Sequence, residues 1–181
     1  MIYLLLADGF EEIEAITVVD ILRRANLDVK MVSASGNLTV TGAHDIVVQA
    51  DIKLADVKKP AMKMLILPGG MPGADNLQKT PEVIELILYA NENDKYIAAI
   101  CAAPKILGMM NILNGKMAVC FPGYEETLIG ATIIDKSVVV DGNIITSKAA
   151  GTVTGFAFAL VHILCGSLQS QAVYKKMLYK D

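Results

Sequence analysis

The sequence is poor in the residues that most metal and cofactor sites require. It holds only 2 histidines and 3 cysteines among 181 residues. It contains neither a Cys-x-x-Cys pair nor two closely spaced histidines, which are the spacings typical of zinc sites. It also lacks Gly-x-Gly-x-x-Gly and the P-loop, the glycine-rich motifs that bind dinucleotides and nucleotide phosphates. We therefore expect no bound metal and no cofactor.

Basic runs and long apolar segments are also missing. The net charge is −3 and no run of lysine and arginine occurs, so nucleic acid is not an expected partner. Residues 1–8 have no basic region ahead of their apolar stretch, which indicates a first strand rather than a signal peptide. The longest apolar stretch, residues 152–165, is too short to cross a bilayer. We expect a cytoplasmic protein that does not contact a membrane.

The cysteines are few, odd in number and far apart in the sequence: Cys101, Cys120 and Cys165. A disulfide framework normally uses an even and denser set of cysteines in a secreted chain. The pattern therefore argues against disulfides and leaves room for one functional thiol.

Apolar residues, in contrast, make up 54% of the chain, whereas charged residues make up 19%. Short apolar runs, which are typical of buried parallel strands, alternate with segments that have helical spacing. This alternation predicts one α/β domain over residues 1–181, with a mostly parallel sheet between two layers of helices. The expected strands cover residues 2–7, 29–33, 64–67, 96–100 and 117–121, and the expected helices cover residues 12–25, 81–91, 102–107, 152–165 and 169–178.

Two smaller features complete the predicted fold. Short strands are expected on either side of Gly42, and Asp141-Gly142 is a strong signal for a second hairpin turn. Ile13 and Ile16 follow the apolar spacing of the first helix, so both are expected to face the core. The apolar excess also fits a surface that is used for dimerisation.

Cys101 has the strongest functional signal, because it follows directly after a predicted strand. Active sites in parallel sheets lie beyond the carboxyl ends of the strands. Small residues surround Cys101 in the segment 98–104, and a nucleophile on a sharp strand-to-helix turn needs such small neighbours. The backbone N–H groups and dipole of the following helix are expected to lower the pKa of the thiol. We predict a reactive thiolate at Cys101; the alternative is a buried structural cysteine.

Two further segments follow strands that end at the same edge. Gly69 and Gly70 come after a buried strand, and glycines there let backbone N–H groups act as oxyanion donors beside a thiolate. Glu14 follows the first strand, within an acidic segment whose other members are expected to be capping and solvated. In a partly apolar site Glu14 would have a raised pKa, and it could then exchange protons with sulfur or substrate.

The sequence closely resembles the DJ-1/ThiJ/PfpI superfamily, and within it the DJ-1 branch, over essentially the whole chain. The matching segments are residues 11–14, 19–25, 67–70, 98–104, 146–147 and 151–152. The resemblance implies a flavodoxin-like three-layer sandwich that forms a homodimer. It also implies that Cys101 is the reactive cysteine and Glu14 its protonated partner, with Gly70 and the backbone of Ala102 forming the oxyanion site. Family members are described as glyoxalases, deglycases, oxidative-stress sensors and chaperones.

The sequence departs from the family pattern at three places. The protease-like branch has histidine directly after the cysteine, where this chain has Ala102. Many DJ-1 members have histidine before the proline that is Pro122 here, where this chain has Phe121. Residues 149–150 are Ala-Ala where the family usually has Gly-Pro. The first two departures remove candidate bases, so acid–base work is expected to fall to Glu14 or to water.

Three functions fit these residues to different degrees. The first is a cofactor-independent enzyme that acts on small 2-oxoaldehydes or their glycation adducts, in which Cys101 adds to the carbonyl carbon. The second is a redox sensor or chaperone that works through oxidation of Cys101. The third is a peptidase or amidase, which needs a base beside sulfur. Neither His44 nor His162, which is expected in the core or at an interface, adjoins Cys101 in sequence, so this third function ranks last.

Overall fold

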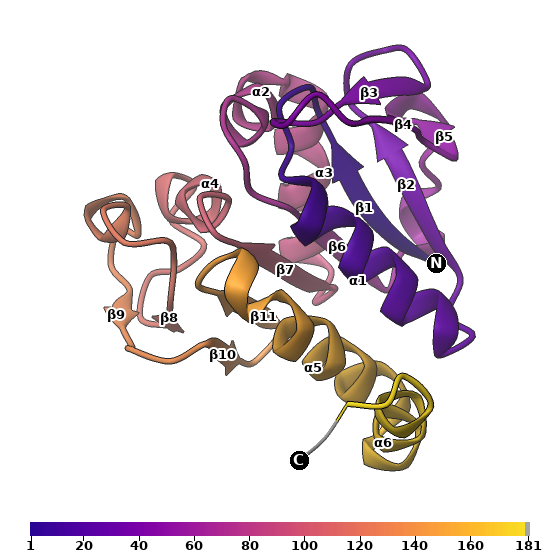
Figure 1. Cartoon of the computed structure of the whole chain (residues 1–181). Coiled ribbons are helices and arrows are strands. Elements are labelled where there is room, and N and C mark those ends of the chain that lie inside the picture. Colours follow the sequence, from indigo (N-terminus) through magenta and orange to yellow (C-terminus); the bar gives the residue numbers. More distant parts are fainter. Residues whose placement is uncertain (180–181) are drawn as a thin grey trace.

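A seven-stranded sheet forms the middle of the protein, seen in a computed structural model that describes residues 1–179 (Figure 1). The strand order is β10-β11-β7-β6-β1-β2-β5. Every neighbouring pair is parallel except β10 and β11, which form an antiparallel hairpin. The strands are β1 (Ile2–Leu6), β2 (Val29–Ser33), β5 (Ile52–Lys53), β6 (Met64–Leu67), β7 (Tyr96–Ile100), β10 (Val138–Asp141) and β11 (Ile144–Ser147).

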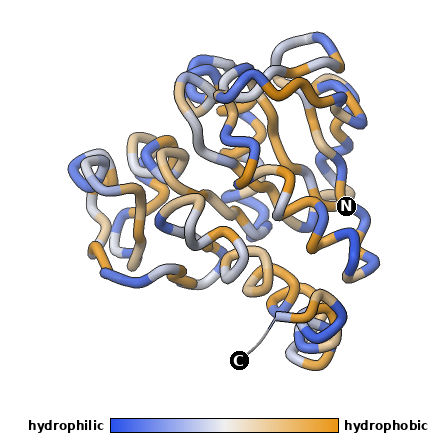
Figure 2. The backbone as a smooth tube through the Cα atoms, viewed as in Figure 1, coloured by the Kyte–Doolittle hydropathy of each residue, from blue (hydrophilic) through white to orange (hydrophobic). Residues whose placement is uncertain are grey.

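The central strands are apolar along their whole length because helices cover both faces of the sheet. Every residue of β1 and β6 is buried, and so are four of the five residues of β7. Successive side chains point to opposite faces, so Leu4 joins one core layer while Tyr3 and Leu5 join the other. Figure 2 shows these hydrophobic strands in the interior of the molecule.

The two helix layers divide the helices between the faces of the sheet. One face is covered by α1 (Glu12–Arg24) and α5 (Val153–Cys165), which pack side by side, with α6 (Ser167–Lys176) against α5 (Figure 1). The other face is covered by α2 (Gly73–Lys79), α3 (Pro81–Glu92) and α4 (Pro104–Met109). The predicted three-layer α/β fold with a mostly parallel sheet is confirmed.

Short elements lie outside the main sheet. Strands β3 (Thr39–Thr41) and β4 (Val47–Gln49) form the predicted hairpin around Gly42, and β8 (Met117–Ala118) pairs with β9 (Thr132–Ile133). The 3-10 turns are η1 (Leu54–Asp56), η2 (Lys59–Ala61), η3 (Glu125–Thr127) and η4 (Ala150–Thr152). The Ala-Ala segment at residues 149–150, which departs from the expected Gly-Pro, lies at the start of η4.

Several local predictions are wrong. Ile13 is 55% exposed and Ile16 39% exposed, because the buried face of α1 is formed instead by residues such as Ala15, Val18 and Leu22. The element expected at residues 117–121 shortens to β8, while α2 and β5 were not expected. His162 is exposed on α5, so it is not part of the core, while its alternative place at an interface stays a prediction.

No helix among residues 1–179 combines the length and the apolar character that crossing a membrane demands. The helix expected at residues 152–165 is present as α5, and it buries Phe156, Leu160 and Val161 in the core.

A matched pair of leucine truncations tests the position of the core. Leu4 in β1 is fully buried, whereas Leu88 on α3 is exposed. We expect Leu4→Ala to lower the free energy of unfolding by about 2–5 kcal/mol, because truncation leaves a cavity between sheet and helices. Leu88→Ala should cost less than about 1 kcal/mol. Urea denaturation of both variants measures this, and equal losses would contradict the burial described above.

Candidate active site

Cys101 occupies a strained turn immediately after β7. Its φ angle is +65°, a left-handed conformation that non-glycine residues rarely adopt. The turn is fixed on both sides, because the Cys101 N–H donates to the carbonyl oxygen of Ser147 at 3.0 Å and its own carbonyl accepts from the N–H of Phe121 at 2.8 Å. The Cys101 side chain is partly exposed, whereas Cys120 is buried. The predicted sharp turn is thus present, and strain of this kind is typical of functional positions.

Glu14 lies against this cysteine from the first turn of α1. Its side chain is only 1% exposed, and Oε2 accepts a hydrogen bond from the Gly69 N–H at 2.8 Å. Oε1 is buried and has no partner of ordinary hydrogen-bond geometry among residues 1–179, and the Cys101 thiol is the side chain that interacts with this carboxyl group. The structure therefore brings together the two predicted catalytic residues.

Gly69 makes this close approach possible. A Cβ atom placed on it would lie 2.6 Å from the Cys101 Cβ and 2.7 Å from Glu14 Oε2, which is closer than real atoms pack. Its N–H is already used by Glu14, so Gly69 does not serve as the oxyanion donor that the sequence suggested. Its place in the site is to hold the carboxyl group instead.

The backbone N–H groups of Gly70 and Ala102 do point at the Cys101 sulfur, where they favour its charged form. Gly70 has a φ angle of +88°, and a Cβ atom there would lie 2.3 Å from the Glu11 nitrogen, so no larger residue fits. These two N–H groups are therefore aimed at the sulfur, and their role as donors to a substrate oxyanion stays a prediction.

Burial raises the pKa of Glu14 to about 7. The hydrogen bond from Gly69 and the interaction with Cys101 oppose this rise, whereas the nearby charge of Glu11 adds to it. A carboxyl group with a pKa near neutrality holds and releases a proton under ordinary conditions, which is what acid–base work requires. The predicted rise in the Glu14 pKa is present in the structure.

The prediction that Cys101 has a lowered pKa is wrong. Burial, followed by the charge of the Glu14 carboxylate and a hydrogen bond to it, raises the pKa of the Cys101 thiol to about 12. Helix α4 begins only at Pro104 and is 6 residues long, so its dipole offers little against these effects. With Glu14 ionised, the proton therefore stays on sulfur. Because each group changes the pKa of the other, Cys101 and Glu14 titrate as a pair.

Lys105 supports the site from α4 and was missed by sequence reasoning. It is only 7% exposed, forms an ion pair with Asp75 on α2, and lies 5.4 Å from the centre of the Tyr124 ring. These contacts tie the helix after Cys101 to the segment after Gly70. The available signal was a single lysine within the apolar segment 102–110.

His44 does not act on Cys101. Its ring nitrogen Nδ1 lies 2.9 Å from Glu12 Oε2, and its backbone N–H donates to Glu12 Oε1 at 2.7 Å. Burial acts to raise the pKa of Glu12, but the hydrogen bonds from His44 and from the backbone outweigh it and lower that pKa. The hydrogen bond to Glu12 in turn raises the pKa of His44. Glu12 is 6% exposed, so the expectation that it is solvated is wrong.

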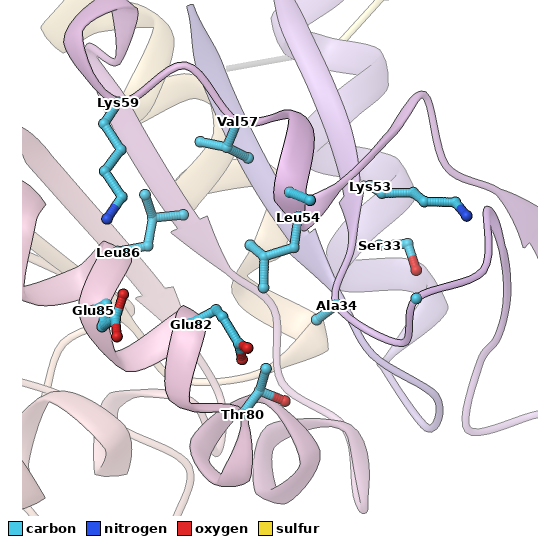
Figure 3. A pocket seen from close by; sticks show the side chains of 12 residues that line it. Ser33, Ala34, Lys53, Leu54, Val57, Lys59, Thr80, Glu82, Glu85 and Leu86 are labelled. Carbon is cyan, nitrogen blue, oxygen red and sulfur yellow. The ribbon is translucent and has the colours of Figure 1, made fainter.

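A cavity of about 520 Å³ lies apart from these residues (Figure 3). It opens between η1, η2 and the start of α3, and Leu54, Val57 and Leu86 form apolar parts of its lining. Neither Cys101 nor Glu14 lines it. The candidate active site is therefore defined by the thiol and the carboxyl group rather than by this cavity.

The Glu14 pKa predicts a specific dependence of stability on pH. Because the pKa in the folded chain is about 7 and the ordinary value is 4.5, the folded chain binds the extra proton between these values. Stability from protonated Glu14 is therefore complete below the ordinary pKa and is lost as pH rises through about 7. Relative to Glu14→Gln, we expect the free energy of unfolding to fall by about 2 kcal/mol between about pH 5 and about pH 8.

Urea denaturation across this pH range measures the difference between the two proteins. Glu85→Gln, which removes an exposed carboxyl group on α3, is the matched control and should follow the wild-type curve. Parallel curves for wild type and Glu14→Gln would mean that Glu14 titrates in its ordinary range.

Comparison with known proteins adds a second line of evidence. A model of the DJ-1/PfpI family matches residues 1–163. Protein dj-1beta of Drosophila melanogaster is 34% identical over 176 residues, which cover 96% of this chain and 94% of that protein. An archaeal relative from Pyrococcus abyssi, named a deglycase, is 28% identical over 165 residues, which cover 90% of this chain and 98% of that protein.

Solved structures also share the fold of this chain. The structure described as oxidized DJ-1 of Toxoplasma gondii has a TM-score of 0.95 and 28% sequence identity, and the match covers 99% of this chain and 98% of that one. Some relatives are longer: this chain spans 37% of Protein DJ-1 homolog B of Arabidopsis thaliana. The similarity thus extends over the whole fold that positions Cys101 and Glu14.

Proposed function

The chain belongs to the DJ-1/PfpI family, and from that premise we propose that it acts on small 2-oxoaldehydes or their glycation adducts through Cys101 and Glu14. The observation that carries the proposal is the buried Glu14 carboxyl group, whose pKa is about 7, held against the Cys101 thiol. The deglycase name of the Pyrococcus abyssi relative supports the same substrate class.

The first step is addition of sulfur to the aldehyde carbon. The Glu14 carboxylate takes the thiol proton as the carbon–sulfur bond forms, so no free thiolate has to build up beforehand. The aldehyde oxygen becomes an oxyanion, which the Gly70 and Ala102 N–H groups stabilise until it receives the proton. The product of this step is a hemithioacetal.

The second step moves a proton between the two carbons. Glu14 takes the proton from the carbon that carries sulfur and returns it to the neighbouring carbonyl carbon through an enediolate. This gives a thioester of a 2-hydroxy acid, and water then releases the acid and restores the thiol. With a glycated amine, sulfur displaces the amine as the carbon–nitrogen bond breaks, and protonated Glu14 supplies the proton to the leaving nitrogen.

Lactate formation from methylglyoxal tests this proposal. We expect wild-type protein to form lactate, and Cys101→Ser to abolish turnover because the hydroxyl is a much weaker nucleophile. Glu14→Gln should lower kcat by about 10²–10⁴-fold, since amides do not transfer protons. The wild-type rate should rise as pH increases through about 7, where Glu14 becomes the carboxylate base.

The control is Cys165→Ser, which removes an exposed thiol that the mechanism does not use. It should retain the wild-type rate. Equal turnover of wild type and Cys101→Ser would sink the enzymatic proposal.

A redox sensor is the alternative function. The partly exposed Cys101 and the unpartnered Glu14 Oε1 favour it, because a protonated carboxyl group can donate a hydrogen bond to a sulfinate oxygen. The structure of the Toxoplasma gondii protein is described as oxidized, and this supports the sensor hypothesis. The thiolate is the form that peroxide oxidises, so oxidation depends on Glu14 holding the shared proton.

Mass spectrometry after mild peroxide treatment tests the sensor. We expect Cys101 to be oxidised to sulfinic acid first, although Cys165 is more exposed, because the Gly70 and Ala102 N–H groups favour the charged form of the Cys101 sulfur. Oxidation of Cys120 or Cys165 ahead of Cys101 would count against a sensor. A peptidase activity has less support, since His44 is bonded to Glu12 and Ala102 follows the cysteine.

We also propose that the protein is a cytoplasmic homodimer, as the family resemblance implies. The exposed Ile13 and Ile16 on α1 offer an apolar face that suits a second copy of the chain. Cys101, Cys120 and Cys165 are all free, which suits a reducing compartment.

A further inference from the structure

Three side chains of metal-binding type meet where the start of α1 touches the β3–β4 hairpin. They are Glu11, Glu12 and His44, and one ligand atom from each lies within 4.8 Å of the other two. His44 Nδ1 is 2.9 Å from Glu12 Oε2 and 3.7 Å from Glu11 Oε1. None of these side chains takes part in the chemistry proposed for Cys101.

The two separations from His44 Nδ1 are close to the spacing of ligands around one metal ion. Zinc binds imidazole nitrogen and carboxylate oxygen at about 2.0–2.2 Å, so two ligands of a tetrahedral site lie about 3.4 Å apart. The two distances from His44 Nδ1 fall on either side of this value. An ion between the three atoms therefore requires only small side-chain movements.

The buried carboxylate of Glu12 is held in place for such a role. Its side chain is only 7% exposed, and Oε1 accepts backbone hydrogen bonds from His44 at 2.7 Å and Ile46 at 3.4 Å. Oε2 is thereby fixed toward the imidazole ring. A rigid ligand of this kind loses little conformational freedom when a metal binds.

The charge around these atoms is unbalanced. In the described part of the chain, no ion pair joins Glu11 or Glu12 to a lysine or arginine, and Asp45 adds a further negative charge near His44. A buried carboxylate is costly without a compensating cation, and an exposed imidazole is a weak one. The N-terminal end of α1 favours anions, but its partial charge is small beside that of a divalent ion.

We propose that Glu11, Glu12 and His44 bind a divalent first-row transition ion of the zinc class. One imidazole nitrogen with two carboxylates suits zinc, cobalt or nickel, whereas magnesium and calcium prefer six or more oxygen ligands. Three protein ligands leave a fourth position for water. The ion links the start of α1 to the hairpin. Short-range motifs could not indicate it, because position 44 is far from positions 11 and 12 in the sequence.

Titration calorimetry with ZnCl₂ tests the site in a Cys101→Ser, Cys165→Ser background, which removes the thiols that could bind zinc elsewhere. We expect one ion per chain. His44→Gln and Glu11→Gln should each weaken zinc binding at least tenfold, since even residues that only orient metal ligands contribute about that much. The control is His162→Gln, which removes the other histidine, exposed on α5, and should bind zinc as the background does.

A second readout separates coordination from a change in folding. Zinc should shift the NMR signals of the His44 ring nitrogens and leave those of His162 in place. Zinc binding of equal strength in the background and in His44→Gln would overturn the proposal, as would no zinc binding at millimolar concentration. The lactate assay is repeated with EDTA present, where we expect an unchanged rate. Failure of the zinc site and failure of the enzymatic proposal therefore give different results.

Discussion

The burial of the Glu14 carboxyl group against the Cys101 sulfur is the constraint on which the site depends. It requires α1 to start directly above the carboxyl ends of β1 and β6, and it requires a residue without a side chain at Gly69. It also fixes the turn after β7, where Cys101 accepts a left-handed backbone conformation. Hydrogen bonds to Ser147 and Phe121 hold that turn against its strain.

Much of the fold follows from local sequence patterns. The apolar runs of β1, β6 and β7 are continuous because both faces of the sheet are covered, and the small residues around Cys101 indicate a sharp turn. The same local reasoning places Ile13 and Ile16 in the core, which is wrong. Helical spacing identifies an apolar stripe but not which of several neighbouring apolar positions meets the sheet.

The charge states of the site residues could not be predicted from local sequence patterns. A thiol before a helix is normally expected to have a lowered pKa, but here burial and a carboxylate from a different element raise it. Likewise Glu12 looks solvated in sequence and is buried, because His44 and Ile46 from a distant hairpin supply its hydrogen bonds. In both cases the neighbours that decide the charge state are remote in sequence.

One shared proton connects the two functions that we propose for the site. When it is on sulfur, Glu14 is a carboxylate and serves as the base for addition to a carbonyl. When it is on Glu14, sulfur is a thiolate stabilised by the Gly70 and Ala102 N–H groups, and this is the form that peroxide attacks. Positions 102 and 121 are alanine and phenylalanine, so no imidazole stands at these two positions to take that proton. The two functions that we propose therefore need alternative positions of the same proton, and conditions that favour one state reduce the population of the other.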